Sequence, residues 1–62
     1  MFKLVLIDSN NETIHKREVG NWDSFAREKF GAMRRRLETK PHHCTLQLID
    51  SGNGTLILEH KQ

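Results

Sequence analysis

The chain has 62 residues, with 10 Lys or Arg, 8 Asp or Glu, a formal net charge of +2 and a 35% apolar share. A chain of about 60 residues buries only about 60% of the surface that it exposes when unfolded, which excludes a large enzyme with a deep cleft. Its single Cys excludes an intramolecular disulfide, and no apolar run approaches the roughly 20 residues of a membrane span. We therefore expect one cytoplasmic domain over residues 1–62, without a signal peptide.

Residues 2–19 are predicted to form a β-hairpin, because two runs with aliphatic and β-branched residues flank a polar cluster. The turn falls at Asn10, Asn11 and Glu12, where Asn tolerates the positive φ that tight turns require. Asp8 precedes this turn, and its carboxylate can accept hydrogen bonds from turn amides, which is a structural role.

Residues 21–39 are predicted to form an amphipathic helix. Asn21 is expected to cap its start and Asp23 to favour its first turn, while Lys40, which precedes a proline, ends it. The apolar residues follow the 3, 1, 4, 3, 4 spacing of one helical stripe. They are Trp22, Phe25, Ala26, Phe30, Met33 and Leu37.

Residues 43–61 are predicted to form a second hairpin that repeats the first. The segment 4–14 recurs at 46–56 with seven of eleven aligned positions identical, in the pattern LxLIDSxNxT. In this copy Gly52, Asn53 and Gly54 suit a three-residue loop, with Gly54 in the left-handed region. Asp50 takes the place of Asp8.

The order of elements predicts a two-layer α+β fold of the ββαββ type, in which one helix packs on one face of a four-stranded antiparallel sheet. The crossover rule favours the strand order 2-1-3-4, with the first and third strands central and a pseudo-twofold axis between the hairpins. Alternation along the strands selects the residues expected under the helix. These are Phe2, Leu4, Leu6, Ile14, Leu46, Leu48, Leu56 and Leu58, with Cys44 as a small core residue.

The opposite face of the sheet is a candidate surface for a protein partner. The predicted register gathers on it Val5, Ile7, His15, Arg17, Ile49 and Ile57. Its four β-branched aliphatic side chains would form an apolar patch, which a second copy of the chain or a different protein could cover. The alternative explanation is β-propensity alone, since Val and Ile are common on exposed strands.

The helix and the segment after it form a second candidate surface, because residues 27–40 carry six Lys or Arg against two Glu and are therefore +4. An anion, an acidic partner or nucleic-acid phosphates could bind there. The strip consists of Arg27, Gly31, Arg34, Arg35, Lys40, His42 and His43. A solvated helix face that complements the helix dipole explains the same pattern.

Catalytic and metal sites are not predicted. His42, Cys44 and His60 could supply three zinc ligands, but a structural zinc site needs four. His43 and Cys44 are neighbours on a strand and point to opposite faces, so they do not form a nucleophile pair. No GxSxG, HExxH or phosphate-binding glycine loop occurs. We therefore expect no cofactor and no enzymatic activity.

The function expected from the sequence is that of a small non-enzymatic regulatory protein, which docks on a protein partner and inhibits or modulates it by occlusion. The basic helix would steer it towards an acidic surface. No membrane association is expected. The alternatives are a homodimer, a nucleic-acid-binding module that contacts phosphates through the basic helix and following loop, and, more remotely, a small metal-dependent enzyme.

Overall fold

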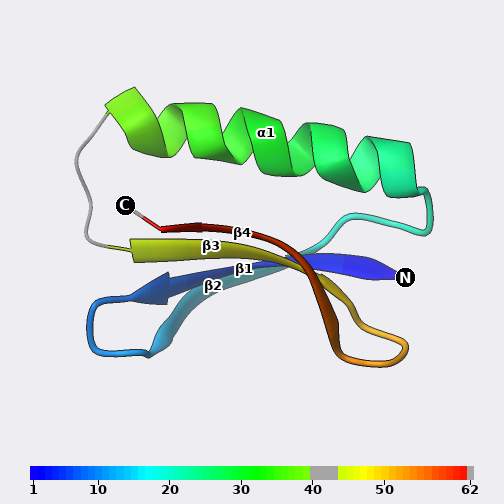
Figure 1. Cartoon of the computed structure of the whole chain (residues 1–62), viewed down its shortest axis with the longest axis horizontal. Coiled ribbons are helices and arrows are strands. Elements are labelled where there is room, and N and C mark those ends of the chain that lie inside the picture. The colour runs from blue at the N-terminus through cyan, green and yellow to red at the C-terminus, as the bar shows by residue number, and fades with distance from the viewer. Residues whose placement is uncertain (40–43, 62) are drawn as a thin grey trace.

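The computed structural model describes residues 1–39 and 44–61. The sheet is antiparallel, with the order β2-β1-β3-β4, and the helix lies across one of its faces (Figure 1). This confirms the predicted two-layer α+β fold and its strand order. The elements are β1 (Phe2–Asp8), β2 (Thr13–Glu18), α1 (Asp23–Thr39), β3 (Cys44–Asp50) and β4 (Thr55–Lys61).

The core lies between α1 and the two central strands. Leu46 and Leu48 are 1% and 0% exposed, and Cys44 is buried as expected. Val19, which the apolar pattern did not select, is also buried because it follows β2 where the chain turns towards the helix. The remaining buried members of this cluster are Leu4, Ala26, Phe30 and Leu37.

Two aromatic residues of the predicted apolar stripe lie outside the core. Trp22 is 76% exposed and Phe25 is 45% exposed. At ~100° per residue, Phe25 projects to one side of the direction in which Ala26 and Phe30 point. Trp22 also precedes the helix, which begins at Asp23 and not at residue 21.

The helix starts without the predicted Asn21 cap. The N–H of Ala26 donates to the carbonyl of Trp22 at 2.9 Å, and Asn21 makes no side-chain hydrogen bond within residues 1–39 and 44–61. At the other end, the hydroxyl of Thr39 donates to the carbonyl of Arg36 at 2.7 Å.

Both turns use the Asp residues of the repeat as predicted. Asp8 Oδ1 accepts two backbone N–H groups, from Asn10 and Glu12, each at 2.9 Å, and Asp50 Oδ1 accepts that of Gly52 at 2.9 Å. The left-handed position is Asn11 in the first turn, with φ 65°. These hydrogen bonds fix the turn ends of β1 and β3.

The second turn is longer than predicted. Asp50 pairs with Thr55, so the loop comprises residues 51–54 and not three residues. Gly54 has φ 74°, as expected for the left-handed position, and its N–H donates to the carbonyl of Asp50 at 2.7 Å.

The first hairpin contains a bulge that changes which side chains face the helix. The register shifts after Leu6, so Ile14 has no partner in β1. His15 lies opposite Leu6 and Arg17 opposite Leu4. Since opposed residues share a face, His15 and Arg17 point to the helix side, and their predicted place on the open face is wrong. Ile14, expected in the core, is 56% exposed.

The second hairpin has a bulge at the matching place. Leu48 lies opposite Leu58 and Ile49 opposite Leu56, so Ile57 is the extra residue. Ile57 packs against the core cluster, whereas Leu56 is 47% exposed on the side of Ile49. The predicted positions of Ile57 and Leu56 are therefore exchanged, while that of Leu58 is confirmed.

The two hairpins meet with the symmetry that the repeat implies. Val5 lies opposite Gln47 in the β1–β3 pair. These two residues are also equivalent in the repeat, which has an offset of 42 residues. The pseudo-twofold axis therefore passes through this pair, at the centre of the sheet.

Candidate binding site

The open face of the sheet, opposite α1, carries apolar residues on three strands. The register places Val5 and Ile7 of β1, Ile49 of β3 and Leu56 of β4 on it. Val5 is only 6% exposed although no described element lies over this face (Figure 1), and it is not part of the main core cluster. The side chains around Val5 therefore cover it, whereas Leu56 is open to contact.

One end of the open face is polar. A shallow depression there is lined by residues of three strands and of the first turn. Its polar groups bond to one another: Gln47 Nε2 donates to Glu59 Oε2 at 2.9 Å, and Lys61 Nζ lies 3.8 Å from Glu59 Oε1. Because these donors and acceptors are already paired, the depression is weaker as a binding site than the apolar side chains of the open face.

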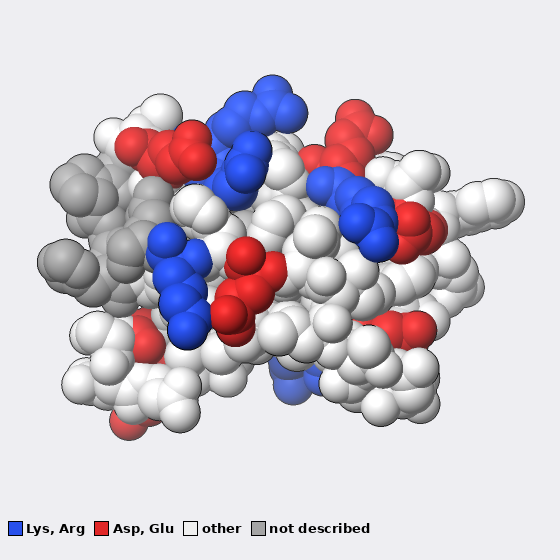
Figure 2. All heavy atoms as spheres, in the orientation of Figure 1, with Lys and Arg blue, Asp and Glu red and all other residues white. Residues whose placement is uncertain are grey.

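The basic strip predicted on the helix is partly neutralised. Arg27 Nε donates to Asp23 Oδ2 at 2.9 Å, and Arg34 Nε lies 3.9 Å from Glu38 Oε1. Figure 2 shows Lys and Arg side chains beside Asp and Glu side chains across the face in view, and not one continuous basic surface.

The space above the helical glycine is not an empty groove. A Cβ at Gly31 would lie 3.9 Å from Nη2 of Arg35, so this guanidinium lies close to the glycine. The other members of the strip, Lys40, His42 and His43, lie outside the described residues.

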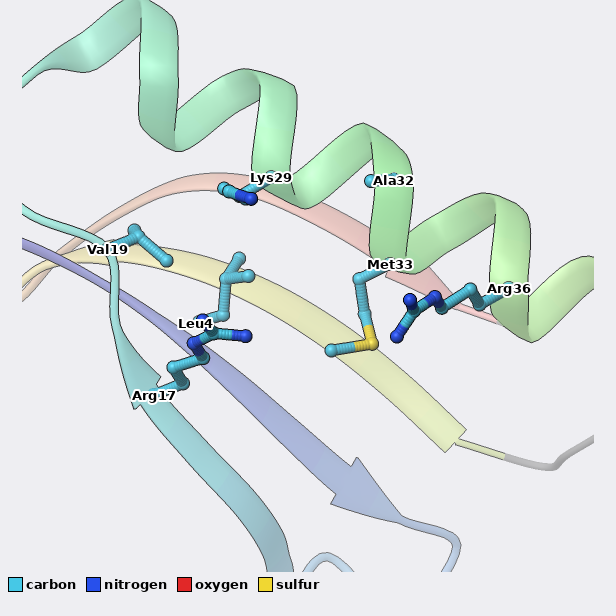
Figure 3. Close-up of a pocket in the computed structure, with 7 residues that line it drawn as sticks. All are labelled: Leu4, Arg17, Val19, Lys29, Ala32, Met33 and Arg36. Atoms are coloured by element: carbon cyan, nitrogen blue, oxygen red, sulfur yellow. The ribbon is translucent and has the colours of Figure 1, made fainter.

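A third surface, which the sequence did not reveal, is a pocket of about 110 Å³ between β2 and α1. Figure 3 shows the side chains of Arg17 from β2 and of Lys29 and Arg36 from α1 around Leu4, Val19 and Met33. We call it the β2–α1 pocket. Its lining residues are Leu4, Arg17, Val19, Lys29, Ala32, Met33 and Arg36.

The β2–α1 pocket combines an apolar floor with three cations. Leu4 and Val19 in its floor are 3% and 5% exposed. Within the described part of the chain, no carboxylate lies within 4.0 Å of a charged nitrogen of Arg17, Lys29 or Arg36. Three like charges around an apolar floor favour an approaching anion.

Lys29, which lines the pocket, also contacts an aromatic ring of α1. Its Nζ lies 5.2 Å from the centroid of the Phe25 ring, which is within the range of a cation–π interaction. One of the three cations that line the pocket is therefore also in contact with an exposed aromatic ring.

Half of this pocket was accessible to sequence reasoning. Lys29, Ala32, Met33 and Arg36 have the i, i+3, i+4, i+7 spacing of one helix side. The place of Arg17 could not be predicted from the sequence, because simple alternation assigns it to the open face. Only the bulge in β2 brings it to the helix side.

The residues considered for zinc do not form a site within the described ranges. Cys44 is a buried free thiol of the core. His60 has a buried Nε2 without a hydrogen-bond partner in the described part of the chain. No three His, Cys, Asp or Glu residues within 1–39 and 44–61 are grouped so as to hold a metal ion.

Two further observations concern the chain as a whole. Among the residues that the structure describes, no helix has the length and apolar character needed to cross a membrane. No family model, no curated protein and no solved structure matches this chain.

Proposed function

We propose that this chain is a non-enzymatic regulatory protein that docks on a protein partner through the open face of its sheet and modulates or inhibits that partner by occlusion. The observation that carries the proposal is the position of Ile7, Ile49 and Leu56 on a face without a covering element. Full burial of one such side chain contributes about 1.5–3 kcal/mol, so a partner that covers this face gains a large part of its affinity there.

A protein partner suits this face better than nucleic acid. Sheets that bind single-stranded nucleic acid stack bases on aromatic side chains. The exposed aromatic residues, Trp22 and Phe25, lie at the start of α1 and not on the open face. On the helix, Arg27 and Arg34 already lie beside carboxylates. Phosphate binding through α1 is therefore the second candidate, and nuclease treatment separates the two.

The proposal includes a cytoplasmic location, which the free thiol of Cys44 supports, because secreted domains of this size usually rely on disulfides. A second copy of the chain is one partner that could cover the open face. In that case the same residues would form a face-to-face homodimer.

A photo-reactive amino acid at Gln47, in the middle of the open face, tests the proposal in cells. The matched control carries the same group at Glu28, which is exposed on α1. We expect one defined protein, or a second copy of the chain, to be cross-linked from position 47 and not from position 28, with no loss after nuclease treatment. Equal products from both positions, or products that disappear with nuclease, contradict docking through the sheet.

The substitution Ile49→Asp tests the affinity of the partner obtained in this way. It places a charge in the apolar patch, and we expect binding to weaken at least ten-fold in titration calorimetry, with little dependence on salt. Ser24→Asp is the control, because it introduces the same charge on an exposed residue of α1, which lies on the opposite face of the sheet. Similar affinities of the two variants would rule out the patch as the contact.

A further inference from the structure

We propose that the free edge of β2 and the β2–α1 pocket together bind an extended acidic peptide segment of a protein. The segment adds to β2 as a fifth strand and places a glutamate side chain among Arg17, Lys29 and Arg36. This goes beyond docking through the open face and does not depend on it, since the two surfaces share no residue.

The backbone of β2 is available on one side. All six of its residues are exposed, and among the described strands its only neighbour is β1. The N–H of Val19 donates to the carbonyl of Phe2 at 2.9 Å, which sets the phase of the ladder. Because antiparallel bonding alternates along a strand, Arg17 bonds towards β1, while the N–H and C=O groups of Lys16 and Glu18 point away from it. A new strand can pair with these groups.

The side chains of the new strand would alternate between the two faces of the sheet. Those beside Arg17 would lie on the helix side, since Arg17 lies opposite Leu4 and lines the β2–α1 pocket. They would point towards the pocket rim that Lys29 and Arg36 of α1 form (Figure 3). Backbone pairing therefore brings alternate residues of the peptide to the three cations.

The size and chemistry of the pocket select the side chain. Pockets for small molecules usually measure about 300–1,000 Å³, so a volume of about 110 Å³ suits one side chain and not a cofactor. Glutamate matches both parts of the pocket, with methylene groups for the floor of Leu4 and Val19 and a carboxylate for the rim. Ion-paired hydrogen bonds from guanidinium groups to carboxylates are among the stronger contacts in proteins.

The opposite edge of the sheet lacks this combination. Lys61 at the end of β4 lies 3.8 Å from Glu59, and on α1 Arg27 and Arg34 are paired with Asp23 and Glu38. An acidic strand at β4 would meet the carboxylate of Glu59. A nucleic acid could contact the cations of the β2–α1 pocket, but it could not pair with the backbone of β2. The aliphatic floor of the pocket also has no aromatic ring on which a base could stack.

The test is an NMR titration of the ¹⁵N-labelled chain with a synthetic peptide of alternating Glu and Thr, and with a control peptide in which Gln replaces Glu. We expect the Glu peptide to shift the amide signals of Lys16 and Glu18, and the Gln peptide to leave them in place. Shifts confined to other residues, or equal effects of the two peptides, would overturn the proposal. Stronger shifts of these amides with oligothymidylate would also overturn it, in favour of nucleic acid.

Matched charge variants test the pocket. Arg36→Glu removes a cation of the rim, and we expect the affinity for the Glu peptide to fall at least ten-fold. Arg35→Glu makes the same change on the exposed side of α1 and should alter the affinity less than three-fold. An equal loss of affinity in both variants would mean that the peptide is held by general electrostatic attraction, and it would contradict a specific pocket.

Two substitutions of Glu18 separate strand addition from charge alone. Both remove a negative charge near the bound peptide, but only Glu18→Pro also removes an outward N–H, at an edge where proline is tolerated. We expect Glu18→Gln to bind the Glu peptide more tightly and Glu18→Pro to bind it more weakly than the parent chain. Tighter binding by both variants would refute strand addition. Ile49→Asp should leave this titration unchanged, so failure of the peptide site and failure of the open face are distinguishable.

Discussion

Leu48 and Leu56 lie in the same hairpin, but their side chains have opposite environments. Leu48 is fully buried under α1, whereas Leu56 is 47% exposed on the open face. We expect Leu48→Ala to lower the free energy of unfolding by about 2–5 kcal/mol, because it removes core contacts and leaves a cavity.

Urea denaturation followed by circular dichroism measures this difference, with Leu56→Ala as the control. A core in so short a chain rarely supplies more than about 3–5 kcal/mol, so Leu48→Ala should be largely unfolded in water at 25 °C. The control should lose less than about 1 kcal/mol. Equal losses would mean that Leu56 is packed as Leu48 is, and that it lies on the helix side of the sheet.

At the residue scale, the hydrogen bonds of the turns could be predicted from the sequence, whereas the surroundings of the cationic side chains could not. Asp8 and Asp50 accept turn amides because their short carboxylates can reach N–H groups two to four residues ahead, which depends only on local sequence. The partners of Arg17 depend on where β2 lies relative to α1, and that is a property of the assembled sheet.

At the scale of single elements, Gly31 and Gly54 are expected to respond in opposite ways to alanine. Gly31 lies inside α1, where alanine is favoured by about 1 kcal/mol and its Cβ would meet only Arg35 Nη2 at 3.9 Å. Gly54 has φ 74°, in a region that costs an L-residue about 1–2 kcal/mol.

Thermal unfolding tests both substitutions. We expect Gly31→Ala to raise the melting temperature by about 4–8 °C and Gly54→Ala to lower it. A decrease with Gly31→Ala would show that the helix needs glycine there for close packing, and no change with Gly54→Ala would place the left-handed position elsewhere in the turn.

The order of the strands could be predicted, but the faces of the edge strands could not. The repeat and the crossover rule depend on topology, which small irregularities do not alter. One extra residue in β2 and one in β4 exchange the faces of the residues on one side of each bulge, because the side chains of a strand alternate with a period of two. The three consecutive apolar residues 56–58 were the one local sign of a bulge.

At the scale of the whole molecule, the single helix makes the two halves of a repeated sheet inequivalent. It adds Lys29 and Arg36 beside the β2 edge. Its acidic residues Asp23 and Glu38, in contrast, pair with Arg27 and Arg34 of the predicted strip. The net charge of the basic segment does not show which of its cations line the pocket and which are paired, because a charge count contains no information on the direction of each side chain.

The pairing of β1 with β3 has a kinetic consequence. The turns within the hairpins span about four residues, but about 35 residues separate β1 from β3. Each doubling of a loop adds about 0.6 kcal/mol to its closure, so joining the hairpins costs about 1.8 kcal/mol more than closing either turn, or roughly twenty-fold in rate. This factor takes the roughly 1–10 μs of a lone hairpin to roughly 20–200 μs, and domains with many non-local contacts fold more slowly still, so we expect refolding on a scale of about a millisecond.

Stopped-flow circular dichroism is the suitable measurement, since the highly exposed Trp22 gives little fluorescence contrast between the folded and unfolded chain. Folding within microseconds would show that the hairpins need no slow encounter. If folding takes milliseconds, a newly made chain contains two formed hairpins before β1 and β3 pair, and the edges of these two strands are unpaired during that time. That interval is when it is most exposed to aggregation.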